Sequence, residues 1–227
     1  MTGGTIATTG VGANGAFATG SGSTLALDGG TIIVTGGTYT ASSKDSPALY
    51  STGVLTVTGA TLTATGAKAA VIEGSNSITL ADSTLSTTFG GKRGVMIYQS
   101  MSGDSTGTIT IKGVTVSEAS GVLLSAAAGS WGTSGSNGGN ATLAADGETL
   151  TGNVTADSVS TATIKLTNGS SLSGMLTNAS ISLDATSSWS VTGNGHTVTY
   201  DATNSASSAH SGGTYTLAGG GRLKPAS

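Results

Sequence analysis

The chain alternates apolar and polar residues over many short runs. In Leu55-Thr56-Val57-Thr58 and in Thr108-Ile109-Thr110-Ile111, an apolar residue stands at every second position. This is the period of a β-strand, whose side chains point alternately to opposite sides. Gly, Asn, Asp or Ser separates the runs, and the one helix-like patch, Ala126-Ala127-Ala128, ends at Gly129. The pattern predicts many short strands joined by turns, and very little helix.

The runs also repeat at longer range. Leu55 and Ile78 are 23 residues apart, and Ile78 and Ile109 are 31 residues apart. A similar unit precedes each run and a third short run follows it; examples are Gly15–Gly20 with Pro47–Gly53, Ala69–Gly74 with Gly94–Tyr98, and Thr61–Thr65 with Ser83–Ser86. Three short strands in a repeat of this length are typical of one coil of a solenoid. An antiparallel sandwich can use the same strands, but it does not usually show such self-similarity.

We therefore predict an all-β fold, a right-handed parallel β-helix with three short strands per coil. A single coil cannot bury its apolar row, but stacked coils place like residues above like and enclose a narrow core. Val71 and Ile78 are expected to point into this core. Thr63 and Thr84 are expected to point outward, where a β-branched side chain suits a strand.

The repeat predicts a single solenoid domain over residues 1–227. We expect regular coils over 1–126, a Gly- and Ser-rich loop over 127–140, and narrower coils with a cap over 141–227. The narrowing follows from closer spacing in the second half, such as the 19 residues between Thr163 and Ser182. At the N-terminus, Thr5–Thr9 enters the repeat with no covering segment before it. Because open strand edges recruit further strands, we expect a homodimer through this coil.

Composition excludes several other classes of protein. The 227 residues include 38 Gly but only 2 Pro, and Gly lacks the period of three that collagen requires. Only 8% of residues are charged and the net charge is −3, with scattered basic residues, so no nucleic-acid partner is expected. No stretch approaches the roughly 20 apolar residues of a membrane span. There is no Cys, and His196 and His210 stand 14 positions apart, so neither a disulfide nor a zinc site nor any other cofactor is predicted.

The strongest candidate for a binding site is a cluster around Glu73. Most Asp residues stand alone in Gly- or Ser-rich corners, where the side chain commonly bonds its own backbone. Glu73 differs because Val71-Ile72-Glu73 and Met96-Ile97-Tyr98 occupy equivalent strands of successive coils, which brings Glu73 close to Tyr98. The cluster that we predict to bind a ligand comprises Glu73, Lys92, Arg93, Tyr98 and Asp104.

Two further inferences concern the chemistry of this region. A lone carboxylate lacks the partner that glycoside cleavage needs, so no catalytic residue is assigned. Trp131, in the Gly-rich loop, is predicted to be exposed and to offer a ring on which a sugar can stack.

Several segments together resemble a known family; they are Asp45–Gly53, Ala69–Gly74, Gly94–Asp104, Ala127–Gly139, Leu166–Gly174 and Leu183–Gly193. They are similar to the adhesin-like right-handed parallel β-helix proteins of bacterial and archaeal cell surfaces, which are pectin-lyase-like solenoids. The resemblance implies an extracellular, cell-surface location and supplies no catalytic residues. Nothing at Met1–Gly4 resembles a signal peptide, so we expect the secretion signal to lie outside this chain.

The predicted function is a non-enzymatic surface module, an adhesin-like stalk that presents a binding surface to a glycan or another cell-surface ligand. Two alternatives remain open. A carbohydrate-active lyase or hydrolase requires carboxylates that converge on one face. An ice-binding solenoid requires a flat ladder of Thr-x-Thr, which Thr56-Val57-Thr58 and Thr63-Ala64-Thr65 suggest. The neighbouring coils are expected to read Ser77-Ile78-Thr79 and Ala26-Leu27-Asp28 opposite Thr56–Thr58, which predicts a broken ladder.

Overall fold

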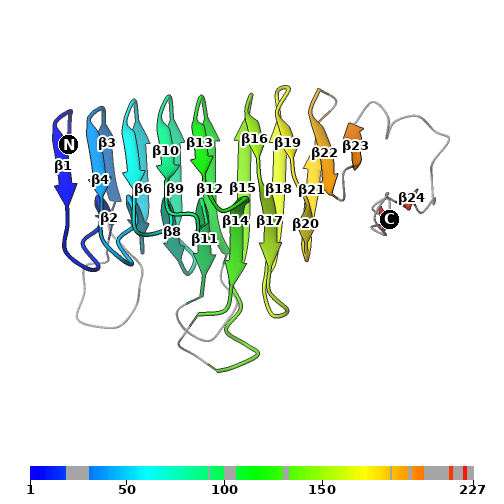
Figure 1. Ribbon diagram of the computed structural model, residues 1–227, viewed down its shortest axis with the longest axis horizontal. Coiled ribbons are helices and arrows are strands. Elements are labelled where there is room, and N and C mark those ends of the chain that lie inside the picture. The colour runs from blue at the N-terminus through cyan, green and yellow to red at the C-terminus, as the bar shows by residue number, and fades with distance from the viewer. Residues whose placement is uncertain are drawn as a thin grey trace.

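The chain folds into a right-handed parallel β-helix, as predicted. A computed structural model describes residues 1–18, 31–91, 93–99, 106–129, 133–184, 186–193, 196–201, 215–216 and 222–223. These residues form stacked coils, and each full coil contributes one strand to each of three faces (Figure 1). No helix occurs within the described residues, and so none that is long and apolar enough to cross a membrane.

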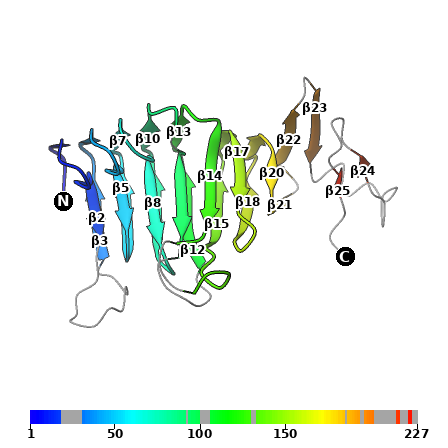
Figure 2. The same ribbon diagram turned by 60° about the horizontal axis from the view of Figure 1, so that its bottom comes forward.

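Face 1 is a parallel sheet that stacks one strand from each coil. Its strands are, in spatial order, β2 (Ala16–Ala18), β5 (Leu49–Ser51), β8 (Ala70–Glu73), β11 (Val95–Tyr98), β14 (Val122–Ala127), β17 (Asn153–Ala156) and β20 (Leu176–Thr177). Figure 2 brings this face toward the viewer.

Face 2 is the second parallel sheet and contains the longest strands. Its strands are β3 (Thr31–Thr35), β6 (Val54–Thr58), β9 (Ser77–Ala81), β12 (Thr106–Lys112), β15 (Asn140–Asp146), β18 (Thr161–Thr167) and β21 (Ala179–Leu183).

Face 3 is divided into two sheets. The first contains β1 (Thr5–Thr8), β4 (Thr38–Ala41), β7 (Thr61–Ala64), β10 (Thr84–Thr87) and β13 (Thr115–Glu118). The second contains β16 (Thr149–Thr151), β19 (Ser171–Ser173), β22 (Ser188–Gly193) and β23 (His196–Asp201), of which β23 runs antiparallel to β22. A separate antiparallel pair consists of β24 (Tyr215–Thr216) and β25 (Arg222–Leu223).

The core is a column of aliphatic side chains stacked coil upon coil. Leu55, Ile78 and Ile109 are register partners in β6, β9 and β12, and each is fully buried. The predicted pairing of these three residues is therefore confirmed. Burial of one such side chain contributes about 1.5–3 kcal/mol, which a single coil cannot obtain alone.

The corner between face 2 and face 3 has the same backbone shape in successive coils. Gly36, Gly59, Asp82, Gly113 and Gly147 occupy it with φ of 67°, 67°, 48°, 65° and 70°. This left-handed conformation is open to Gly and tolerable for Asp and Asn, but costly for other side chains. The recurring Gly and Asp between the runs therefore serve as the corner residues of the coil.

The length of the coil varies along the stack. The separation between neighbouring coils is 23 residues from Thr63 to Ser86, 34 from Val114 to Glu148, and 17 from Thr163 to Ser180. Face 3 divides at the longest coil. There the buried Glu148 carboxylate accepts a hydrogen bond from the Val114 amide at 3.0 Å and so links the two parts.

Two predicted registers are wrong by two residues. Thr163 pairs with Ser180 rather than Ser182, and Thr56–Thr58 lies opposite Thr79–Ala81 rather than Ser77–Thr79. On its other side, Thr56–Thr58 pairs with Ile33–Thr35, while residues 26–28 lie outside the described part. A shift of two keeps every apolar residue on the inner side, so alternation alone cannot detect it.

At the N-terminal end, the first residues add to face 2. Thr2 forms a parallel bridge with Thr35, and the Met1 amino group donates to the Ile33 carbonyl at 2.9 Å. Within the described residues, β1 and β2 each pair with a strand on one side only. The homodimer through this coil stays a prediction.

Candidate functional site

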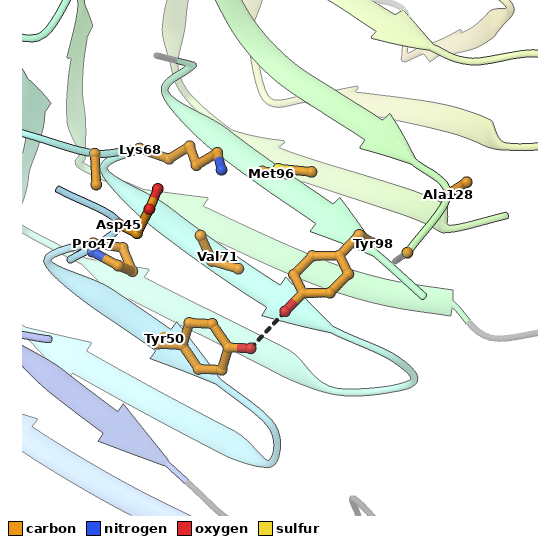
Figure 3. Close-up of a pocket in the computed structure, with 10 residues that line it drawn as sticks. Asp45, Pro47, Tyr50, Lys68, Val71, Met96, Tyr98 and Ala128 are labelled. Carbon is orange, nitrogen blue, oxygen red and sulfur yellow. Dashed lines mark hydrogen bonds between the residues drawn. The ribbon is translucent and has the colours of Figure 1, made fainter. Parts of the chain in front are cut away.

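A groove of about 330 Å³ is present on the outer side of face 1, across β5, β8 and β11. Its lining comes from these strands and from the turns beside them, and consists of Asp45, Pro47, Tyr50, Ala67, Lys68, Val71, Met96, Tyr98, Ala128 and Gly129. Figure 3 shows these side chains around the groove.

The middle of the groove is a row of outward residues in register. Tyr50 pairs with Val71, and Val71 pairs with Met96, so the three side chains stack across three coils. Their chain neighbours, such as Leu49 and Ile72, point into the core and are fully buried. Val71 is only 4% exposed, yet it lines the groove. The prediction that Val71 points into the core is therefore wrong.

Three oxygen atoms meet at one end of this row. Tyr98 Oη donates to Glu73 Oε2 at 2.8 Å, Tyr50 Oη donates to the same oxygen, and the two hydroxyl oxygens lie 2.6 Å apart (Figure 3). Only two hydroxyl protons serve these three oxygens, so the arrangement is satisfied with Glu73 as the acceptor. Glu73 is 9% exposed and is not part of the groove lining. It fixes the two rings from behind.

The surroundings keep both tyrosines in the neutral form. Burial, and then the hydrogen bond to Glu73, raises the pKa of Tyr50 well above its ordinary value. Burial also raises the pKa of Tyr98; its contact with Tyr50 opposes the rise and the bond to Glu73 adds to it. Both hydroxyls therefore act as hydrogen-bond donors and not as bases or nucleophiles.

Aromatic surface continues beyond the groove toward the N-terminal coil. Phe17 is the register partner of Tyr50, and their rings pack edge to face with centroids 5.0 Å apart at 79°. Phe17 is 44% exposed. The row of Phe17, Tyr50, Val71 and Met96 runs along the helix axis for about 14 Å at the usual strand spacing.

Charged groups lie on the other side of the groove. Figure 3 places Asp45 and Lys68 across Val71 from the tyrosine hydroxyls. Asp45 occupies a left-handed turn position with φ of 57°, just before β5. Of the described residues that line the groove, Asp45 alone carries a carboxylate.

The structure brings together part of the predicted cluster. The predicted proximity of Glu73 and Tyr98 is confirmed by their hydrogen bond. Arg93 is exposed in the turn before β11 and does not line the groove. Lys92, Asp104 and Trp131 lie outside the described residues, so their predicted roles stay predictions.

Tyr50 is the main residue that the sequence-based prediction missed. Its hydroxyl reaches Glu73, 23 residues further along the chain. This is the same separation as between Leu55 and Ile78, so the repeat itself carried the signal. Met96 and Lys68 offered no comparable signal, because their place in the groove depends on turns of unequal length.

The arrangement suits binding better than bond cleavage. Hydrolysis of a glycosidic bond usually requires two carboxyl groups on opposite sides of that bond. Here Glu73 is engaged behind the tyrosines, which leaves Asp45 as the carboxylate of the groove. Among the residues that the structure describes, no three His, Cys, Asp or Glu side chains are grouped to hold a metal ion.

Comparison with known proteins returns no match to any family model, curated protein or solved structure. The relation to adhesin-like proteins therefore rests on the segments quoted above.

Proposed function

We propose that the chain is a non-enzymatic, extracellular β-helix module of the adhesin type, and that the groove of face 1 binds a glycan. The observation that carries the proposal is the tyrosine pair: Tyr50 and Tyr98 are fixed by one carboxylate beside the apolar Val71 and Met96. Rigid aromatic rings beside a few polar groups are typical of sites for small ligands, and a sugar ring stacks on such a surface.

The dimensions and chemistry of the groove support this class of ligand. The row from Phe17 to Met96 follows the helix axis over several coils, so an extended oligosaccharide can contact one ring after another. Lys68 and Asp45 lie at hand for hydroxyl or charged substituents of the sugar (Figure 3). The parallel stack serves as the rigid support that holds these groups in place.

The proposal is tested by measuring binding to a panel of neutral, acidic and basic oligosaccharides. We expect at least one class to bind, and Tyr98→Ala or Tyr50→Ala to weaken its binding at least tenfold, because aromatic anchors dominate such contacts. Glu73→Gln is expected to weaken binding less, because it loosens the rings without removing them.

The matched control is Thr155→Ala. Thr155 lies in the same outward row of face 1, as the register partner of Ser125 in β14, but outside the groove. Its substitution should leave binding unchanged. Absence of binding to every glycan in the panel, or equal binding by the tyrosine variants, would contradict the proposal; release of shorter products from a bound glycan would favour the enzyme instead.

A further inference from the structure

Face 3 carries an ordered array of hydroxyl groups. In its strands the first and third residues point outward and the second points inward, as in β7, where Leu62 is fully buried between Thr61 and Thr63. The registers stack the outward residues in two rows. The first row contains Thr5, Thr38, Thr61, Thr84 and Thr115, and the second contains Ala7, Thr40, Thr63, Ser86 and Ser117.

The array continues beyond the division of the face. In β16, β19 and β22 the corresponding rows contain Thr149, Ser171 and Ser188, and Thr151, Ser173 and Ser190. Thus every position of the two rows except Ala7 is Thr or Ser, and none is charged. We call these the hydroxyl rows.

The other faces show that composition alone does not account for this order. Face 2 is built by the same coils from the same Ser- and Thr-rich chain, yet Val54, Lys112 and Lys165 interrupt its outward rows. Face 1 carries the aromatic groove. If Thr were present only as a good outward strand residue, the three faces should be equally uniform.

The array is regular in two directions. Hydroxyls repeat about 4.8 Å apart along the helix axis and about 6.7 Å apart across each strand. The buried column fixes this register, so the hydroxyls are held in place before any partner arrives. In the second row, Ser86 Oγ donates to Thr63 Oγ1 at 3.1 Å, which couples neighbouring coils.

We propose that the hydroxyl rows bind ice. A surface that repeats in two dimensions, without charge or pockets, matches a partner that is itself a flat lattice. Each hydroxyl both donates and accepts, as water does, and the Thr methyl groups fill the space between. Because the array is already ordered, water in a matching lattice can bond to it at little further entropic cost. A single glycan chain, by contrast, needs a groove with stacking rings, which this face does not offer in its described rows.

The earlier objection to ice binding applied to a different face. Thr56-Val57-Thr58 lies on face 2, where the ladder is interrupted on both sides. The unbroken rows lie on face 3. The inference does not depend on the glycan proposal, because the hydroxyl rows and the groove share no residue.

The test is thermal hysteresis and ice-crystal shaping by the full chain, compared between two double variants. Thr61→Lys with Thr84→Lys interrupts the hydroxyl rows at one exposed and one half-buried position. Thr79→Lys with Thr56→Lys makes the same changes in the same coils on face 2, again at one exposed and one half-buried position.

We expect the unmodified chain to produce hysteresis, the face 3 variant to lose most of it, and the face 2 variant to keep it. The circular dichroism and melting curves of both variants serve as the check on folding, and Thr115→Lys at the exposed end of the first row provides a milder variant. Absence of hysteresis in the unmodified chain, or equal loss in both double variants, overturns the proposal. Binding to crystalline cellulose through face 3 without any effect on ice also overturns it.

Discussion

Face 1 and face 3 are built by the same coils around the same core, yet their outer surfaces are opposite in character. Face 3 repeats Thr or Ser in straight rows, whereas face 1 places Phe17, Tyr50, Val71 and Met96 in one row and opens a groove beside them. The inward residues are aliphatic on both faces. In a β-helix the core therefore fixes where outward residues stand but leaves their chemistry free.

The turns explain why only one face has a groove. Face 3 begins at a tight left-handed corner that holds one residue, such as Gly59 or Asp82, in the same place in each coil. The segments that lead from face 3 into face 1 are longer and unequal, and they supply Asp45, Lys68 and other walls of the groove. A uniform turn yields a uniform surface, and a variable turn yields a site.

The largest expected effect separates the inner from the outer side of face 1. Ile72→Ala should lower the free energy of unfolding by about 2–5 kcal/mol, since it leaves a cavity in a fully buried position. Val71→Ala, one residue earlier, should cost only about 1 kcal/mol, because the groove lies over Val71. Denaturant unfolding measures both, and equal losses would mean that Val71 belongs to the core.

A second prediction concerns the corner that starts face 3. Gly59→Val should destabilise the protein by roughly 1–2 kcal/mol, because a β-branched residue is strained at φ of 67°. Gly59→Asn should cost less, since Asp82 occupies the equivalent corner of the next coil. Thermal melting of the two variants checks this order, and a Val variant as stable as the Asn variant would contradict the corner's role.

The core was predictable from sequence because its signal is repeated in every coil. Leu55, Ile78 and Ile109 stand at the right period and recur at the length of a coil, so fold and inner side followed. The outer side was harder. Register errors of two residues left the core unchanged but moved the Thr ladder to the wrong partners, and with it the assignment of the ice-binding motif.

The candidate site was predictable only where it followed the repeat. Glu73 and Tyr98 occupy equivalent positions of successive coils, and their contact was foreseen. Val71 was assigned to the wrong side because β8 is buried at every position, so burial there does not alternate. Lys68 and Asp45 come from turns, whose path depends on packing that a single sequence does not encode locally.

A smaller effect should distinguish the faces by pH. The pKa values of Tyr50 and Tyr98 are raised in the folded protein, so the stability that they contribute is present below about pH 10 and is lost as the pH rises above it. Allowing for solvent screening, the loss by pH 11 is under about 1 kcal/mol for each tyrosine.

Denaturant unfolding at pH 8 and pH 11 measures this loss. Tyr98→Phe should lose less stability than the unmodified chain over the same interval, since it has one fewer tyrosine to ionise. A face 3 variant such as Thr61→Ser should match the unmodified chain. Equal pH dependence for all three proteins would contradict the buried tyrosine pair.

The smallest effect is expected within the hydroxyl rows. Thr84→Ser keeps the hydroxyl at an outward, half-buried position and should change the free energy of unfolding by less than about 0.5 kcal/mol. Thermal melting suffices to measure it. A cost as large as that of Val71→Ala would show that face 3 packs against something and is not a free outer surface.

The most direct test of the account is an NMR titration of the labelled chain with a glycan that binds it. We predict amide shifts at Tyr50, Val71, Met96 and Tyr98, with those of Thr61 and Thr84 unchanged, because the groove lies on face 1 and the hydroxyl rows on face 3. Shifts concentrated on Thr61 and Thr84, or spread evenly over both faces, would contradict the assignment of the glycan site to the tyrosine groove.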